Sequence, residues 1–315
     1  MSKNYPRDFN QVTILYRFTL LNSQNHLFRI PQSYEFSTCS GDSWQRGNGQ
    51  RVIAFAFYGD PQSKTHQERG YFEGIIKNLE AISSFYNSSW SVRLYHDISP
   101  DHPLMVDLCN LACSTDRLDL CPVYQLPHYL LANAVNMFPM IWRFFPTLDP
   151  QVDAFMSRDL DSIIKLREVK AVEEWLESGK TLHVMRDHPY HMATPMPGGL
   201  WGVLRTQSRE AWKDVWENIW SAIIADPLSQ SDKGTKGPDQ MLLFRYIWEQ
   251  LSGGVMQHDS VSCASSFELW SRGAVGFPSK RSNETGNFVG AAPGSERYHI
   301  ECPKECRRNQ SWIFC

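Results

Sequence analysis

Short apolar runs alternate with longer segments of helical periodicity from residue 51 onward. Residues 51–58 form a continuous apolar run, as in a strand that is buried on both faces. In residues 71–86, apolar side chains such as Phe72, Ile75 and Leu79 recur every three or four positions, which predicts an amphipathic helix. The same patterns predict strands at 91–95, 122–126, 154–156, 181–185, 198–204 and 254–257, and helices at 103–113, 134–145, 166–177, 209–224 and 239–250.

This alternation predicts a single α/β domain with a mainly parallel, Rossmann-like sheet and helices on both faces. Residues 1–50 are polar and lack the pattern, so we expect an irregular N-terminal extension. The domain itself is expected over residues 51–263. Residues 264–315, rich in Gly, Ser, Pro and Cys, are expected to form a tail packed on the domain rather than a second domain.

Composition narrows the classes of function. The chain has 315 residues, 42% of them hydrophobic and 21% charged, as in an ordinary globular protein. Its formal net charge is -3 and no basic stripe dominates, so nucleic acid is not an expected partner.

The cysteines and glycosylation sequons bear on the cellular compartment. Three of the eight cysteines lie in the last fourteen residues, which favours a disulfide-tied tail, with buried free thiols as the alternative. Sequons begin at Asn87, Asn283 and Asn309. Together these features favour the lumen of the secretory pathway, such as the Golgi. No signal peptide or membrane anchor is visible, so a cytoplasmic location stays open.

An acidic pair, Asp159 and Asp161, follows the strand predicted at 154–156. Residues two apart in extended chain point to the same side, so both carboxylates can face one site. In open α/β sheets, ligands lie beyond the carboxyl ends of the strands. Paired oxygen ligands suit Mg²⁺ or Mn²⁺, and such a cation usually holds phosphates as well. The alternative roles are a turn cap for Asp159 and a helix N-cap for Asp161.

A second polar group follows a strand near the end of the domain. His258 comes after the strand predicted at 254–257, and a neutral imidazole is a suitable ligand for Mn²⁺. A purely structural histidine is the alternative. The neighbouring Asp259 is a candidate for an alternative ligand or for a residue that orients His258.

The order of these features resembles that of the GT-A class of nucleotide-sugar-dependent glycosyltransferases. The resemblance covers roughly residues 51–263 and rests on five segments in sequence: Tyr58-Gly59-Asp60, Asp159-x-Asp161, Gly198-Gly199-Leu200-Trp201-Gly202, Asp239-Gln240 and His258-Asp259. It implies a metal-dependent, hexosyltransferase-like enzyme that moves a sugar from a UDP- or GDP-sugar to a hydroxyl of a glycan or protein.

The resemblance also implies roles for individual residues. Asp159 and Asp161 would bind Mn²⁺ or Mg²⁺ with the donor diphosphate, and His258 would be a further metal ligand. The loop Tyr58-Gly59-Asp60 would contact the nucleotide. Gly199 would allow a close approach to the sugar, and Trp201 would stack on it. The alternative for this segment is a β-bulge with a tryptophan in the core.

Three further charged residues are candidates for contacts or catalysis. Asp187 follows the strand predicted at 181–185 and could bond to a donor hydroxyl, although a solvated loop is the alternative. Asp239 could be the base if the reaction inverts the anomeric centre, or only an N-cap. Arg143, a charge inside an apolar predicted helix, could reach either the donor or a core carboxylate.

Two other classes of protein share parts of this pattern. A sugar nucleotidyltransferase would have a glycine- and lysine-rich loop after its first strand, whereas here that loop lacks the glycine density. A Rossmann dehydrogenase fails for the same reason. A non-catalytic carbohydrate-binding protein on a transferase fold is the remaining alternative.

Overall fold

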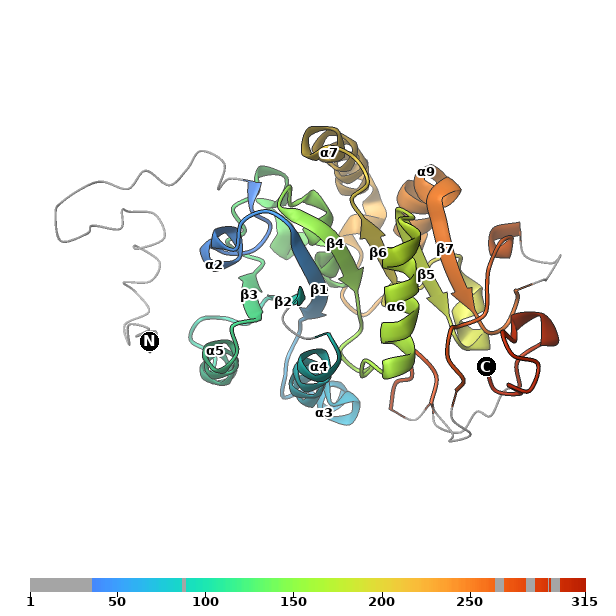
Figure 1. The fold of residues 1–315 in the computed structure, drawn as a ribbon. Helices are drawn as coiled ribbons and strands as arrows, with labels where there is room; N and C mark the ends of the chain where they lie inside the picture. Colours follow the sequence, from blue (N-terminus) through green and yellow to red (C-terminus); the bar gives the residue numbers. More distant parts are fainter. Residues whose placement is uncertain (1–35, 87–88, 264–268, 282–286, 294, 296–300) are drawn as a thin grey trace.

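The computed structural model describes residues 36–86, 89–263, 269–281, 287–293, 295 and 301–315. Its centre is a seven-stranded sheet with the order β3-β2-β1-β4-β6-β5-β7 (Figure 1). Strand β6 runs antiparallel to both of its neighbours, and the other neighbouring pairs are parallel. The strands are β1 Gln50–Phe57, β2 Ser91–His96, β3 Leu118–Pro122, β4 Val152–Ser157, β5 Leu182–Arg186, β6 Trp201–Leu204 and β7 Val255–Asp259. The predicted α/β fold class is therefore confirmed.

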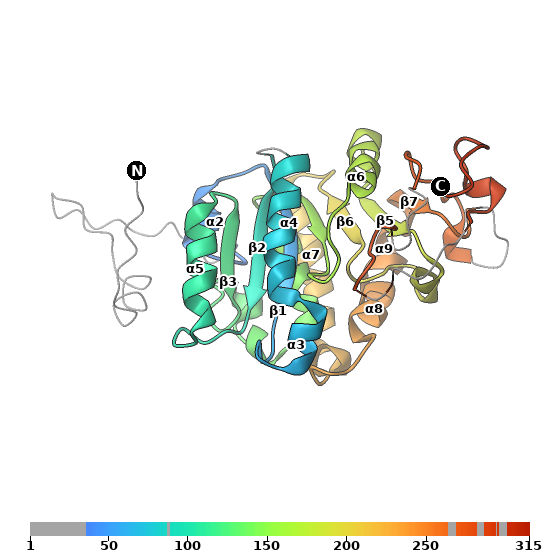
Figure 2. The same cartoon turned by 90° about the horizontal axis from the view of Figure 1, so that it is seen from below.

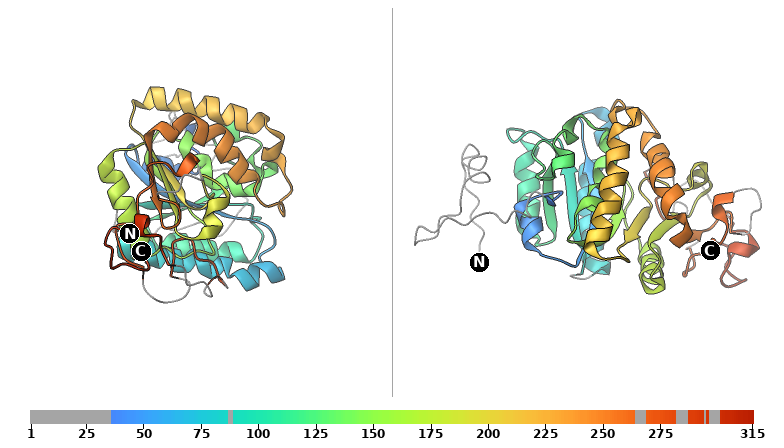
Figure 3. Two further views of the ribbon diagram at one scale, coloured as in Figure 1. Left: turned by 90° about the vertical axis from the view of Figure 1, so that its right-hand side faces the viewer. Right: turned by 90° about the horizontal axis from the view of Figure 1, so that it is seen from above.

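Helices cover both faces of the sheet (Figures 2 and 3). Helices α4, α5 and α6 lie on one face, while α7 and the 3₁₀ segment η5 lie on the other. The α-helices are α2 Gly41–Gln45, α3 Lys64–Arg69, α4 Tyr71–Phe85, α5 Leu104–Ser114, α6 Leu166–Ser178, α7 Arg209–Ala225, α8 Pro238–Leu242 and α9 Glu249–Leu251. The main irregular helices are the 3₁₀ segments η3 Tyr129–Leu131, η5 Pro139–Leu148 and η6 Pro189–Ala193, and the π-helix η8 Leu243–Trp248.

Strand β1 divides the core into two layers because its side chains alternate between the faces. Val52 and Ala54 belong to the cluster that includes Trp216 of α7. Ile53 and Phe55 belong to the opposite cluster, with α4, α5 and α6. A strand that is buried on both faces explains the continuous apolar run in the sequence.

The strand predicted at 122–126 and the helix predicted at 134–145 differ most from the observed elements. Strand β3 spans Leu118–Pro122 rather than 122–126. The charged residue Asp119 interrupts the apolar pattern of this strand in the sequence. In the folded chain its buried carboxylate pairs with Arg46 at 2.8 Å. The helix predicted at 134–145 is instead a series of 3₁₀ segments, because Pro139 and Pro146 remove the backbone donors of a regular α-helix.

Strand β7 continues two residues beyond its predicted end, because Met185 and Arg186 of β5 pair with His258 and Asp259. His258 and Asp259 therefore lie within the sheet rather than in a loop after it.

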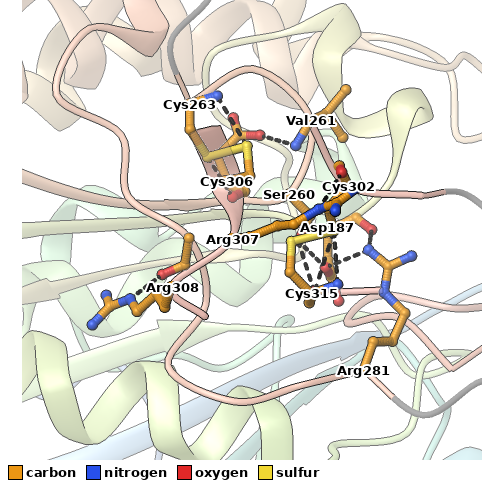
Figure 4. The surroundings of a disulfide bond; sticks show 12 residues. Asp187, Ser260, Val261, Cys263, Arg281, Cys302, Cys306, Arg307, Arg308 and Cys315 are labelled. Atoms are coloured by element: carbon orange, nitrogen blue, oxygen red, sulfur yellow. Dashed lines mark hydrogen bonds and ion pairs between the residues drawn. A yellow bond between two sulfur atoms is a disulfide. The ribbon is translucent and has the colours of Figure 1, made fainter. Parts of the chain in front are cut away.

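Three disulfides tie the two ends of the domain. Cys39–Cys121 joins the segment before the sheet to β3, while Cys263–Cys306 and Cys302–Cys315 bind the C-terminal tail (Figure 4). The expectation of a disulfide-tied tail is confirmed, and such bonds are typical of an oxidising lumen or the cell exterior. Within the part of the chain that the structure describes, Cys109 and Cys113 are free thiols.

Part of the N-terminal extension and the asparagines of two sequons lie outside the described residues. Residues 1–35 of the extension are among these, whereas residues 36–49 contain helix α2, capped by Ser40 and Ser43. Asn87 and Asn283 are also outside, while Asn309 is exposed. Among the described helices, none has the length and apolar character needed to cross a bilayer.

We predict that removing the Cys39–Cys121 disulfide destabilises the domain. The bond closes a loop with a sequence separation of 82, so its loss frees the unfolded chain and lowers the free energy of unfolding by about 2–4 kcal/mol. Urea denaturation of the double variant C39S/C121S measures this change. The matched control is Cys113→Ser, which removes an exposed free thiol and leaves the midpoint unchanged. Equal midpoints for the two variants would refute the prediction.

Candidate functional site

The acidic pair lies where β4 ends. Leu160, between the two aspartates, is buried against α4, where a Cβ on Gly74 would lie only 2.0 Å from the Leu160 carbonyl oxygen. This close contact anchors the segment. The carboxylates on either side remain accessible, since the side chains of Asp159 and Asp161 are 39% and 17% exposed.

The antiparallel direction of β6 brings a glycine segment to the same edge. Because β6 runs opposite to β4, the residues that precede β6 lie beside those that follow β4. Ser157 Oγ donates a hydrogen bond to the Gly198 carbonyl oxygen at 2.7 Å. A Cβ on Gly199 would lie 2.0 Å from Asp159 Oδ2. Glycine is thus required here by the approach of the carboxylate itself.

A buried guanidinium joins two of the candidate carboxylates. Arg143, from η5, forms ion pairs with Asp159 and with Asp239, the latter at 3.2 Å between Nη2 and Oδ2. Asp239 is buried in the first turn of α8, two residues after Gly237, which holds the N-cap position. The alternative role of Asp239 as an N-cap is therefore not observed. The sequence left two roles open for Arg143, a contact with the donor or with a carboxylate in the core. The contacts that the structure describes are with carboxylates.

The α3–α4 turn adds two residues that the sequence did not single out. Arg69 Nη1 lies 3.5 Å from Asp161 Oδ2. Burial raises the pKa of Tyr71, and the Asp161 carboxylate raises it further, so this phenol also lies in the field of the acidic pair. Gly70, with a φ of +63°, sets this turn. Nothing in the local pattern of residues 69–71 indicates a site, because the turn meets Asp161 only in the folded chain.

The charges at this edge do not balance. Asp159, Asp161 and Asp239 carry three negative charges, against the two positive charges of Arg69 and Arg143. Burial raises the pKa of Asp161 to about 6, and the neighbouring Asp159 carboxylate contributes to the rise. Burial also raises the pKa of Asp239. An excess of negative charge on hard oxygen donors is the setting that a divalent cation stabilises.

The loop after β1 borders the same site. Tyr58 packs edge-on against Trp142 with ring centroids 6.0 Å apart, and its pKa is raised to about 12, chiefly by burial. Gly59, at a φ of +85°, donates its backbone N–H to Asp97 at 3.2 Å. Asp60 is exposed and accepts the backbone N–H of Gln62 at 2.8 Å. Tyr58 lies within the electrostatic field of Arg143 and Asp159.

His258 lies apart from the acidic pair in a separate buried network. Its Nδ1 is 2.8 Å from His183 Nε2, and its Nε2 is 3.3 Å from a Glu174 oxygen. Both ring nitrogens are thus engaged, and burial lowers the pKa of His258 to about 4. The β5–β7 register directs the ring to this position, so the expectation that His258 shares a cation with Asp159 does not fit the geometry.

Trp201 and Asp187 are also buried in structural roles. Trp201 packs edge-on against Phe144 and Phe155, each with ring centroids 5.1 Å away, so it presents no face to a sugar. Asp187 accepts bonds from Arg167 at 2.8 Å and Arg281 at 3.0 Å. These guanidiniums outweigh the opposing effect of burial and lower the pKa of Asp187 to about 2. Asp187 therefore fits neither a solvated loop nor a donor contact.

No family model matches the chain, and no curated protein matches it. Several solved structures resemble it in part. These include the mannosyltransferase Ktr4p from S. cerevisiae in complex with GDP, with a TM-score of 0.30 and 9% identity over 80% of each chain. A 4-diphosphocytidyl-2C-methyl-D-erythritol synthase from Anaerococcus prevotii has a TM-score of 0.40 and 10% identity, over 67% of this chain and 87% of that one.

S. aureus TarS, residues 1–349, has a TM-score of 0.31 and 12% identity. The match covers 44% of this chain, which spans only 36% of the TarS structure.

Proposed function

We propose that this protein is a metal-dependent glycosyltransferase of the secretory pathway, in the Golgi, which transfers a sugar from a UDP- or GDP-sugar to a hydroxyl of a glycan or glycoprotein. The observation that carries the proposal is the convergence of Asp159, Asp161 and Asp239 at one edge of the sheet, with a surplus of negative charge and two accessible carboxylates.

The donor set fits Mn²⁺ or Mg²⁺. Asp159 and Asp161 would hold the cation through carboxylate oxygens, the ligands that hard divalent ions prefer. His258 is not part of this set, because both of its ring nitrogens already have partners. When bound, the cation would neutralise charge on the departing nucleoside diphosphate.

The surrounding residues have roles that follow from their contacts. Arg143 orients Asp159 by its ion pair and holds Asp239 in the same site. Arg69 is partly exposed, and its 3.5 Å contact with Asp161 is long, so its guanidinium can turn toward a phosphate. Tyr58 provides a wall for the nucleotide. If the reaction inverts the anomeric centre, Asp239 is the base, because burial raises its pKa toward the range that proton transfer requires.

The proposal predicts that Asp161→Ala loses metal-linked binding of the donor nucleotide. Without this carboxylate the cation has one ligand fewer, so we expect the Mn²⁺-dependent affinity for UDP or GDP to fall by a factor of about 100 or more. Isothermal titration with and without Mn²⁺ measures it, and hydrolysis of nucleotide sugars measures turnover. The control is Asp153→Ala, which removes an acid at the other end of β4 that pairs with Arg205.

The result separates the alternatives. Normal metal-linked binding in Asp161→Ala would overturn the proposal. Loss of binding in the variant, together with nucleotide binding but no turnover by the native chain on any acceptor tested, would favour a non-catalytic carbohydrate-binding protein. Release of diphosphate from a nucleoside triphosphate and a sugar phosphate would favour a nucleotidyltransferase.

A second prediction concerns the stability of the metal-free protein. The folded chain raises the pKa of Asp161 to about 6 from an ordinary value of 3.8, so ionising this group opposes folding. The cost of ionising Asp161 lowers the free energy of unfolding. This cost is absent below pH 4, grows as the pH rises to about 6, and is constant above that. We expect Asp161→Asn to be more stable than the native chain at pH 7, by about 1–3 kcal/mol, with the gain shrinking toward pH 4.

Urea denaturation in chelator at pH 4, 5, 6 and 7 measures this difference. Added Mn²⁺ should raise the stability of the native chain and leave that of Asp161→Asn unchanged. An asparagine variant that is less stable than the native chain at pH 7 would instead indicate a structural role for Asp161, through Arg69.

A further inference from the structure

Helix α3 places a histidine, His66, between the carboxyl end of β1 and the start of α4 (Figure 1). The His66 ring meets the ring of Phe57, the last residue of β1, edge-on, with centroids 5.5 Å apart and an interplanar angle of 73°. It meets Tyr71, the first residue of α4, in the same way at 5.0 Å and 69°. Two aromatic neighbours from different elements therefore hold the orientation of this ring.

The Nε2 atom of His66 lies close to the loop that follows β1. A Cβ added to Gly59 would be 3.5 Å from Nε2, so this nitrogen is beside the backbone of the loop. The backbone N–H of His66 bonds to Ser63 Oγ at 3.3 Å, but no hydrogen bond among the described residues engages a ring nitrogen of His66. The residue is only partly buried. A ligand in the site can therefore be the partner of Nε2.

His66 lies between the loop proposed to contact the nucleotide and the acidic pair proposed to hold the cation. Gly59 of the loop is on one side of the ring. On the other side, Tyr71 lies in the electrostatic field of Asp161. Arg69, three residues after His66 on α3, has its Nη1 3.5 Å from Asp161 Oδ2. Residues three apart share one side of a helix, so His66 and Arg69 both face the site.

We propose that His66 binds the α-phosphate of the donor nucleotide through Nε2. This inference rests on the proposed function and adds the residue that recognises one part of the donor. The α-phosphate joins the ribose to the β-phosphate, so it must cross the space between the loop and the cation. An imidazole N–H donates to a phosphate oxygen, and the charge of the phosphate strengthens the bond. The ring is already held in place, so little conformational entropy is lost on binding.

Helix α3 then divides the diphosphate between two residues. Arg69 adjoins Asp161, so it reaches the β-phosphate, which the cation also holds. The three carboxylates of the site repel both phosphates, and hydrogen-bond donors on α3 offset part of that repulsion. A nucleoside monophosphate lacks the β-phosphate, so it keeps the contact with His66 and loses the one with Arg69.

The chain allows a sharp pair of variants on α3. His66→Phe removes both ring nitrogens and keeps an aromatic ring between Phe57 and Tyr71, so the packing is retained. The matched control is Lys64→Ala. Lys64 precedes His66 by two residues, about 200° around the helix, and its side chain is 86% exposed beside Glu68. This control measures any general attraction between the charge of α3 and a phosphate.

Isothermal titration of the whole chain with Mn²⁺ compares UDP or GDP with the matching monophosphate, UMP or GMP. Competition against the diphosphate serves where the monophosphate binds weakly. We expect His66→Phe to weaken both ligands by a similar factor of about ten, because both carry the α-phosphate. Arg69→Ala should weaken the diphosphate by about tenfold or more and the monophosphate by less than about threefold. Lys64→Ala should match the native chain.

A second pair of variants gives the answer if phenylalanine distorts the turn, which urea denaturation reveals. His66→Gln retains an N–H donor, so it should bind the monophosphate more tightly than His66→Ala does. Native-like binding of both nucleotides by His66→Phe would overturn the inference. A loss confined to the diphosphate, or an equal loss in Lys64→Ala, would also overturn it.

Failure of the proposed function has a different signature. In that case binding of UDP or GDP by the native chain depends neither on Mn²⁺ nor on Asp161, while the loss in His66→Phe persists. If instead the binding is linked to Mn²⁺ and His66→Phe matches the native chain, the inference alone is refuted. A native chain that binds no nucleotide refutes both.

Discussion

The guanidinium of Arg143, buried between two carboxylates, is the interaction on which the candidate site depends. Asp159 follows β4 and Asp239 lies in the first turn of α8, and the two acids are 80 residues apart in sequence. A buried guanidinium without partners would be strongly destabilising, and the fold is therefore favoured when both acids reach it. The same convergence leaves Asp161 beside the pair with its charge only partly compensated by Arg69.

A second buried cluster, around Asp187, shows how environment separates acids of one type. Two guanidiniums surround Asp187 and lower its pKa to about 2, whereas burial beside Asp159 raises the pKa of Asp161 to about 6. The first arrangement stabilises the fold by fixing the C-terminal tail to the end of β5. The arrangement around Asp161 persists in the folded chain despite an electrostatic cost. Such a cost is more often found in functional sites than in structural ion pairs.

Two local features of the chain have a reason only in this context. Gly199 has no side chain because the carboxylate of Asp159 occupies the space that a Cβ would need. Strand β6, which runs antiparallel to both of its neighbours, places this glycine at the edge where the parallel strands β4 and β5 end. The disulfides of the tail act on the same region, since the backbone carbonyl of Cys315 bonds to Arg167, a partner of Asp187.

The sequence by itself determined the α/β class, most helices and strands, and the acidic pair after a buried strand. These features depend on periodicity and on the run length of apolar residues, which are local properties. Partner choice is not local. A polar residue at the end of an apolar run has the same pattern at His258 as at Asp159, and only the pairing of β7 with β5 directs His258 to His183 and Glu174. For the same reason Arg69 and Tyr71 gave no signal, because the contact of their turn with Asp161 exists only in the tertiary structure.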